Sequence, residues 1–104
     1  MDTIHKLKLQ QPFFDDVLYG RKTFEVRKDN RGFEVGDVVV LMEYEGDKPL
    51  QGSIKMLITY ILPGGQHGIE KGYVVLGLSK MDTGESITLS KPAIKEFNVS
   101  KVML

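Results

Sequence analysis

The feature that most constrains this chain is a run of charged residues that alternate with apolar ones, at positions 20–28. Phe24 and Val26 are two residues apart, so in a β-strand their side chains point to one face. The opposite face then carries a hydroxyl, a carboxylate and a guanidinium, from Thr23, Glu25 and Arg27. The pattern predicts a strand that buries its apolar face. Its polar face is either a recognition surface or an ordinary solvated edge.

Length and composition suit one domain with one core. The chain has 104 residues, of which 41% are hydrophobic and 27% charged, and this is enough apolar material for a packed interior. Basic and acidic residues both number 14, so net charge points to neither nucleic acid nor a membrane surface. Positions 20–31 nevertheless hold five basic residues against two acidic ones, a local excess that could form a basic patch.

Several chemistries have no support in the composition. The sequence has no cysteine, which removes disulfides, thiolate catalysis and cysteine metal sites. His5 and His67 are far apart and lack ligand spacing, so we expect no metal and no cofactor. No apolar run approaches the roughly 20 residues of a membrane helix, and the N-terminus lacks a secretory leader. We therefore expect a cytoplasmic protein without a membrane partner, and we take it to be a monomer.

Hydrophobic periodicity predicts a mainly β chain with one early helix. Strands are expected at 4–9, 22–28, 38–42, 53–62 and 73–78. The continuous apolar runs at 38–42 and 73–78 favour strands that are buried on both faces. In a helix at 11–19, one stripe would collect Phe13, Phe14, Val17 and Leu18. Pro12 suits the first turn of this helix, and Gly20 suits its end.

Two further expectations concern the later part of the chain. One face of the 53–62 strand would carry Ile54, Met56, Ile58, Tyr60 and Leu62. The signal weakens after Lys80, so a barrel domain at 1–80 would be followed by an extension at 81–104. That extension would hold a strand at 85–89 and a short helix at 91–97, or it would be partly disordered.

Five or six strands with a few short helices in about 80 residues indicate a small mixed α+β fold, in which the sheet curls into a barrel. Closing the sheet on itself removes exposed edges, and the N-terminal helix is then left to cover one open side. The groove beside that helix is the natural place for a ligand. The charged strand follows the helix directly, so its polar face is the candidate site.

Five segments of the chain carry a resemblance to a known family. They are 5–9, 14–28, 33–37, 59–62 and 72–76, and the most specific is the Gly-x-Lys-Thr-x-Glu-x-Arg core at 20–27, followed by Val-Gly-Asp at 35–37. The pattern resembles the DUF3850 family, in the ASCH group of the PUA-like superfamily, from residue 4 to about 79. The resemblance implies a PUA-like (ASCH) β-barrel with the helix against its side.

The same resemblance implies a function in handling RNA or modified nucleotides. Most ASCH-type proteins are assigned RNA binding by analogy with PUA domains. One branch hydrolyses acylated cytidine nucleosides, using a lysine, a hydroxyl two residues past the motif threonine, and a later glutamate. Carried over, the lysine is Lys22, but the hydroxyl position holds Glu25, and the later glutamate has no identified counterpart. The sequence therefore lacks the nucleophilic side chain of that branch.

The charged candidates each have a functional and a structural interpretation. Arg27, Lys28 and Arg31 could bind phosphates, which supply most nucleic-acid affinity, or they could form a solvated strand end. Lys22 and Glu25 could hold or activate a substrate. If the two touch, they resemble a structural ion pair. Inside a cleft, Glu25 could instead accept hydrogen bonds from the amino group of a base.

The uncharged candidates have the same two interpretations. Thr23 could donate to a ligand, or it could be a strand former satisfied by the backbone. Three tyrosines are undecided between these interpretations, because a tyrosine at a barrel rim keeps its polar end in water: Tyr44, Tyr60 and Tyr73. Four phenylalanines could stack bases, although their places on apolar stripes favour core packing: Phe13, Phe14, Phe24 and Phe33.

Three functional hypotheses follow. The leading one is an RNA- or nucleotide-binding module whose polar cleft is formed by Lys22, Thr23, Glu25, Arg27, Lys28 and Arg31. The alternative is an amidohydrolase-type enzyme acting on acylated cytidine nucleosides, with Lys22 and Glu25 as catalytic residues. A second alternative is a small protein-interaction domain in which residues 80–104 dock a partner. The sequence does not choose between RNA, DNA and a free nucleotide.

Overall fold

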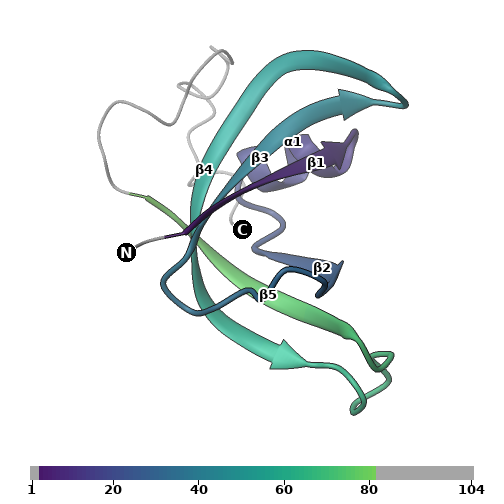
Figure 1. Cartoon of the computed structure of the whole chain (residues 1–104). Coiled ribbons are helices and arrows are strands. Elements are labelled where there is room, and N and C mark those ends of the chain that lie inside the picture. Colours follow the sequence, from purple (N-terminus) through teal and green to yellow (C-terminus); the bar gives the residue numbers. More distant parts are fainter. Residues whose placement is uncertain (1–2, 82–104) are drawn as a thin grey trace.

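In the computed structural model, which describes residues 3–81, the strands form one sheet of five that curls into a half-barrel (Figure 1). The elements are, in chain order, β1 (Ile4–Gln10), α1 (Phe13–Leu18), β2 (Phe24–Lys28), β3 (Val38–Glu45), β4 (Lys48–Pro63) and β5 (Tyr73–Lys80). The expected mainly β class and all the strand positions expected before residue 80 are confirmed. Beyond Met81, the expected extension lies outside the described residues.

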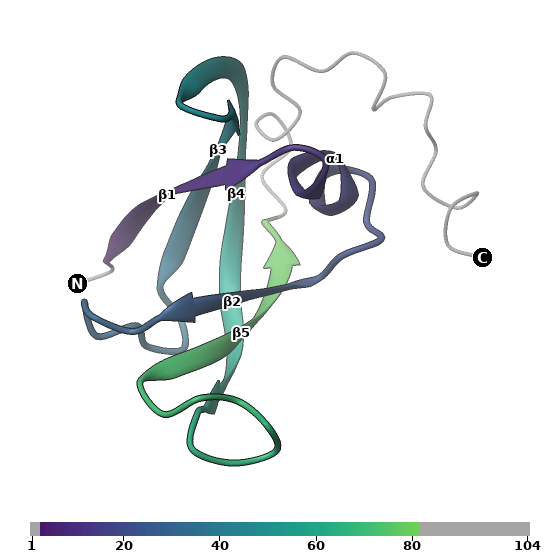
Figure 2. The ribbon, with the colours of Figure 1, turned by 90° about the vertical axis from the view of Figure 1, so that its right-hand side faces the viewer.

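The middle of the sheet is a run of antiparallel neighbours, and the first two strands of the chain lie at its ends. The strand order is β1-β3-β4-β5-β2, with β1 parallel to β3 and the other pairs antiparallel. The curl brings β1 and β2 to face one another (Figure 2). They do not pair, so the expected closure into a barrel is incomplete, and a seam remains between these two strands.

The concave side of the sheet holds the core. Alternate residues of β1, β3, β4 and β5 are buried there, as their burial patterns show. The core residues are Leu7, Leu9, Phe14, Val17, Leu18, Phe33, Val39, Leu41, Ile54, Met56, Ile58, Val74, Leu76 and Leu78. The expectation that 38–42 and 73–78 are buried on both faces is wrong. Their outer side chains are half-buried, because the described chain covers the convex face only in part.

The expected apolar face of β4 is right as far as Ile58 and wrong beyond it. The pairing with β5 shifts register between Ile58 and Tyr60. An extra residue in one strand reverses which side chains face inward. Tyr60 is therefore 63% exposed, and Ile61 packs against the core instead.

Helix α1 is shorter than the expected 11–19 but uses the expected stripe in part. Phe14, Val17 and Leu18 are buried, and the helix contacts β1 and β3. Phe13 is 50% exposed, so its predicted core packing is wrong. It is the first residue of the helix and lies at the edge of the apolar stripe. Gly20 follows the helix with φ +82, a left-handed conformation that glycine adopts without strain.

Candidate functional site

Strand β2 has the opposite orientation to the one expected. Glu25 is 3% exposed, whereas Phe24 and Val26 are 44% and 47% exposed. Glu25 lies opposite Leu76 in the antiparallel pair, and opposite residues share a face. Because Leu76 is fully buried, Glu25 also points inward. The predicted burial of Phe24 and Val26 is therefore wrong, and the polar face of β2 is the interior one.

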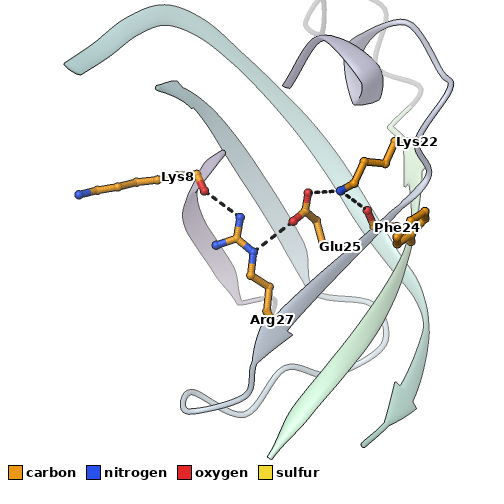
Figure 3. Close-up of polar contacts among 5 residues, drawn as sticks. All are labelled: Lys8, Lys22, Phe24, Glu25 and Arg27. Atoms are coloured by element: carbon orange, nitrogen blue, oxygen red, sulfur yellow. Dashed lines mark hydrogen bonds and ion pairs between the residues drawn. The ribbon is translucent and has the colours of Figure 1, made fainter. Parts of the chain in front are cut away.

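The buried carboxylate of Glu25 is held between two cations (Figure 3). Lys22 Nζ lies 2.8 Å from Glu25 Oε2, and Arg27 Nε lies 3.2 Å from Glu25 Oε1. The side chains of Lys22 and Arg27 are 19% and 24% exposed, so both cations reach solvent. Lys22 Nζ also donates to the carbonyl oxygen of Phe24 at 2.8 Å. The structure therefore brings together three of the predicted site residues, as one network.

Arg27 also bridges the seam. One of its terminal nitrogens donates to the backbone carbonyl of Lys8 in β1, at 2.8 Å. A carbonyl at the free edge of β1 thus receives a side-chain partner in place of a strand. This contact joins the two ends of the sheet (Figure 3).

A pocket of about 210 Å³ opens beside this network, between β1, α1 and β2. It is lined by Leu9, Phe13, Lys22, Phe24, Glu25 and Val26. Lys22 Nζ is 4.9 Å from the centre of the Phe24 ring and 6.0 Å from that of Phe13, which is cation–π range. The half-exposed rings of Phe13 and Phe24 therefore flank the ion pair of Lys22 and Glu25. Leu9 was missed as a site residue, and Phe13, considered for base stacking, was assigned to the core, because both approach β2 only through the fold.

Thr23 lies outside this pocket. It lines a second, more apolar pocket of about 330 Å³, together with Val17, Gly20, Lys22, Met56, Leu78, Ser79 and Lys80. The carbonyl of Thr23 accepts a hydrogen bond from the Leu78 amide at 2.9 Å. Lys80 Nζ donates to the Leu18 carbonyl, near the end of α1, at 3.1 Å, and burial lowers the pKa of Lys80.

Lys28 and Arg31 are not part of the network. Lys28 is exposed at the end of β2, and Arg31 is exposed in the following turn. The guanidinium of Arg31 lies 5.8 Å from the centre of the Phe33 ring, and Phe33 is buried as expected. Both cations remain accessible to an anion, but neither touches Glu25. His67 is exposed in the loop between β4 and β5.

A buried pair that the sequence did not suggest lies at the start of β3. His5 Nε2 and Asp37 Oδ2 are 2.8 Å apart, and the ring of His5 packs against Phe33, with centroids 4.7 Å apart. Asp37 Oδ2 also accepts the Glu34 amide at 3.0 Å. Burial alone would raise the pKa of Asp37, but the His5 and Glu34 hydrogen bonds and the charge of His5 together lower it. The Val-Gly-Asp sequence was the available signal for this turn.

A second buried carboxylate, Glu43, lies on β3. Its oxygens accept hydrogen bonds from Gln11 Nε2 at 2.7 Å and from the Gly52 amide at 2.9 Å. Gln11 also donates to Asp15 at 3.0 Å.

Within residues 3–81, no three or more His, Asp and Glu side chains are grouped so that they could hold a metal ion. In the same part of the chain, no helix has the length and apolarity to span a membrane.

Fold and site together define a small curled β half-barrel with an ion-paired pocket at its open seam. The family described as a domain of unknown function, DUF3850, matches residues 4–78, and the chain belongs to this family. Over 44 residues it is 46% identical to an uncharacterized 12.9 kDa protein in the GpA 3′ region of Escherichia phage P2. That match spans 42% of this chain and 40% of the phage protein. The expected DUF3850 membership is thus confirmed.

Proposed function

We propose that the chain is an RNA- or nucleotide-binding module of the PUA-like (ASCH) kind, whose pocket takes one planar base. The observation that supports this most is the pairing of two half-exposed rings with a buried charge network. Phe13 and Phe24 flank the pocket, and Lys22 and Glu25 line it. Aromatic rings stack on the faces of bases, and polar groups contact their edges.

The network keeps hydrogen-bonding capacity for a ligand. An ammonium has three donors, and Lys22 uses two of them on Phe24 and Glu25. A carboxylate offers about four lone-pair sites, and Glu25 uses one on Lys22 and one on Arg27. A donor and an acceptor therefore lie side by side. This arrangement suits the edge of a base, where an amino group stands next to a ring nitrogen or a carbonyl.

The size of the pocket sets what it can take. About 210 Å³ is below the roughly 300–1,000 Å³ of ordinary ligand pockets. A single ring system would fit, with the sugar and phosphate outside. Arg27 is partly exposed and Lys28 is exposed, so both could reach a phosphate there. Arg31 lies further along the same chain segment and would add a weaker contact.

A binding titration tests this proposal. In an NMR titration with short RNA, short DNA and cytidine derivatives, we expect amide shifts at residues 9, 13 and 22–26. Lys22→Ala and Arg27→Ala should each raise the Kd about tenfold, as expected for one charged hydrogen bond. Lys55→Ala, a matched loss of an exposed lysine on β4, should leave the Kd unchanged. An unchanged Kd in both site variants would refute the proposal.

The enzyme alternative has less support from the geometry. Lys22 and Glu25 are in direct contact at 2.8 Å, and the second oxygen of Glu25 is held by Arg27. This is the arrangement of a structural ion pair more than of a free general base. A turnover assay with acylated cytidines would decide the matter. Hydrolysis by the wild type above a Glu25→Gln control would establish the enzyme.

A further inference from the structure

The outer face of β2, β5 and the end of β4 carries apolar side chains that continue beyond the pocket, whose lining includes Phe24 and Val26. Phe24 lies opposite Gly77 in β5, and Gly77 lies opposite Tyr60 in β4. Phe24 and Tyr60 are 44% and 63% exposed. The neighbouring row of the same face consists of Val26, Val75 and Leu62.

The register places these side chains on one face. Opposite residues of an antiparallel pair point the same way, and a Cβ added at Gly77 would lie 3.2 Å from that of Tyr60. Phe24 and Tyr60 therefore stand on either side of a residue that has no side chain. Two strand spacings separate them, about 9.5 Å. The result is a shallow slot with an aromatic ring on each side.

The charges around this face match a polyanion. Lys28 continues the outer row of β2 beside Tyr73, and Lys22, which is paired with Glu25, lies 4.9 Å from the centre of the Phe24 ring. By strand alternation, the outer face of β2, of β5 and of residues 60–63 carries no Asp or Glu. A second copy of this chain docked face to face would bring cations toward cations, which is unfavourable. An apolar face with cations beside it therefore fits a single-stranded nucleic acid better than a second copy.

We propose that this face continues the binding site, so that the ligand is a single strand of several nucleotides and not a free nucleotide. One base occupies the pocket, the strand passes over Phe24, and a later base stacks on Tyr60. The phosphates lie toward Lys28. This inference rests on the proposed function and adds Tyr60 to its contacts.

The spacing predicts a dependence on ligand length. Stacked nucleotides rise about 3.4 Å each, so about 9.5 Å between Phe24 and Tyr60 corresponds to roughly three steps. A mononucleotide in the pocket does not reach Tyr60, whereas a hexanucleotide does. Affinity should therefore rise from the monophosphate to the hexamer, and Tyr60 should contribute only to the hexamer.

The test uses the full chain with single-stranded RNA and DNA hexamers and the four ribonucleoside 5′-monophosphates. Tyr60→Ala should raise the hexamer Kd about 5- to 100-fold, the effect of one stacked base, and should leave the monophosphate Kd unchanged. Tyr60→Phe should restore hexamer binding, because it keeps the ring. Ile4→Ala removes a side chain that is 58% exposed on β1, and it should change neither Kd.

The outcomes separate this inference from the proposed function. Hexamer binding by the wild type that Tyr60→Ala leaves intact would overturn the inference and leave the function standing. If neither hexamer nor any monophosphate bound, the proposed function would fall and the inference with it. Self-association of the wild type that Tyr60→Ala abolishes would assign the face to a second copy, and would also overturn the inference.

Discussion

Glu25 shows how a single side chain sets the character of the site. It is 3% exposed, and burying an unpaired carboxylate is costly. The cost is offset because each oxygen has its own cation, Lys22 or Arg27. Both cations stay partly in solvent, so their own desolvation is limited. The network therefore offsets the cost of burying Glu25 and leaves one side in solvent, where the proposed ligand would bind.

The His5–Asp37 pair predicts a pH dependence of stability. The pKa of Asp37 in the folded chain lies below its ordinary value of 3.8. Its stabilising contribution is therefore fully present above that ordinary value, which the unfolded chain keeps, and is lost as pH falls through the lower folded value. Asp37→Asn should lower the free energy of unfolding by about 1 kcal/mol at pH 7.

Urea unfolding of both chains between pH 7 and pH 2 measures this effect. The difference between wild type and Asp37→Asn should shrink as Asp37 becomes protonated in the most acidic samples. A difference that stays constant over the whole range would show that the ionised form of Asp37 is not what matters.

At the scale of elements, β4 connects the two halves of the sheet and has two irregular features, a register shift after Ile58 and a buried glycine at position 52. The register shift after Ile58 turns Tyr60 outward. At its other end, Gly52 is buried and lies under the ring of Phe14, which is fully buried. A Cβ on Gly52 would lie 2.9 Å from that ring and 2.5 Å from Glu43 Oε1. The missing side chain is thus what lets α1 pack onto the sheet here.

Gly52→Ala should therefore destabilise the chain, by about 1–3 kcal/mol, through overpacking against Phe14. The measurement is the urea midpoint at a constant m-value. Ser53→Ala, at the next and only half-buried position, is the control and should have a small effect. A midpoint that does not move in Gly52→Ala would mean that Phe14 shifts without cost.

At the scale of the whole molecule, the seam between β1 and β2 contains both the contact that joins the ends of the sheet and the proposed binding pocket. Strand pairing leaves these two strands as the ends of a curled sheet. An unpaired edge strand can pair with a strand of another chain. Arg27 spans the seam through the Lys8 carbonyl. The pocket opens along the same seam, so a ligand there would contact both ends of the sheet.

Arg27→Met should loosen the seam, because it keeps the aliphatic stem and removes the guanidinium. We expect a loss of about 1–3 kcal/mol in the free energy of unfolding. Amide exchange should become faster than in the wild type, and more so in β1 and β2 than in β3 and β4. Lys28→Met, at an exposed position of the same strand, is the matched control. Equal exchange rates in Arg27→Met and wild type would show that the bridge does not hold the sheet ends.

The local sequence determined most of the elements and the composition of the site. Alternation and apolar runs located every described strand, the punctuation at Pro12 and Gly20 located the helix, and the Gly-x-Lys-Thr-x-Glu-x-Arg core contained the three residues of the network. These features depend on neighbours in the chain, so local pattern is sufficient to find them.

The tertiary structure alone decided which way the pattern faces. A period of two distinguishes two faces of β2 but does not say which one is inside. That choice follows from the pairing of Glu25 with Leu76, about fifty residues later, and from the cations that make a buried carboxylate tolerable. The same non-local pairing exposes Phe24, turns Tyr60 outward at the bulge, and brings Lys8 within reach of Arg27.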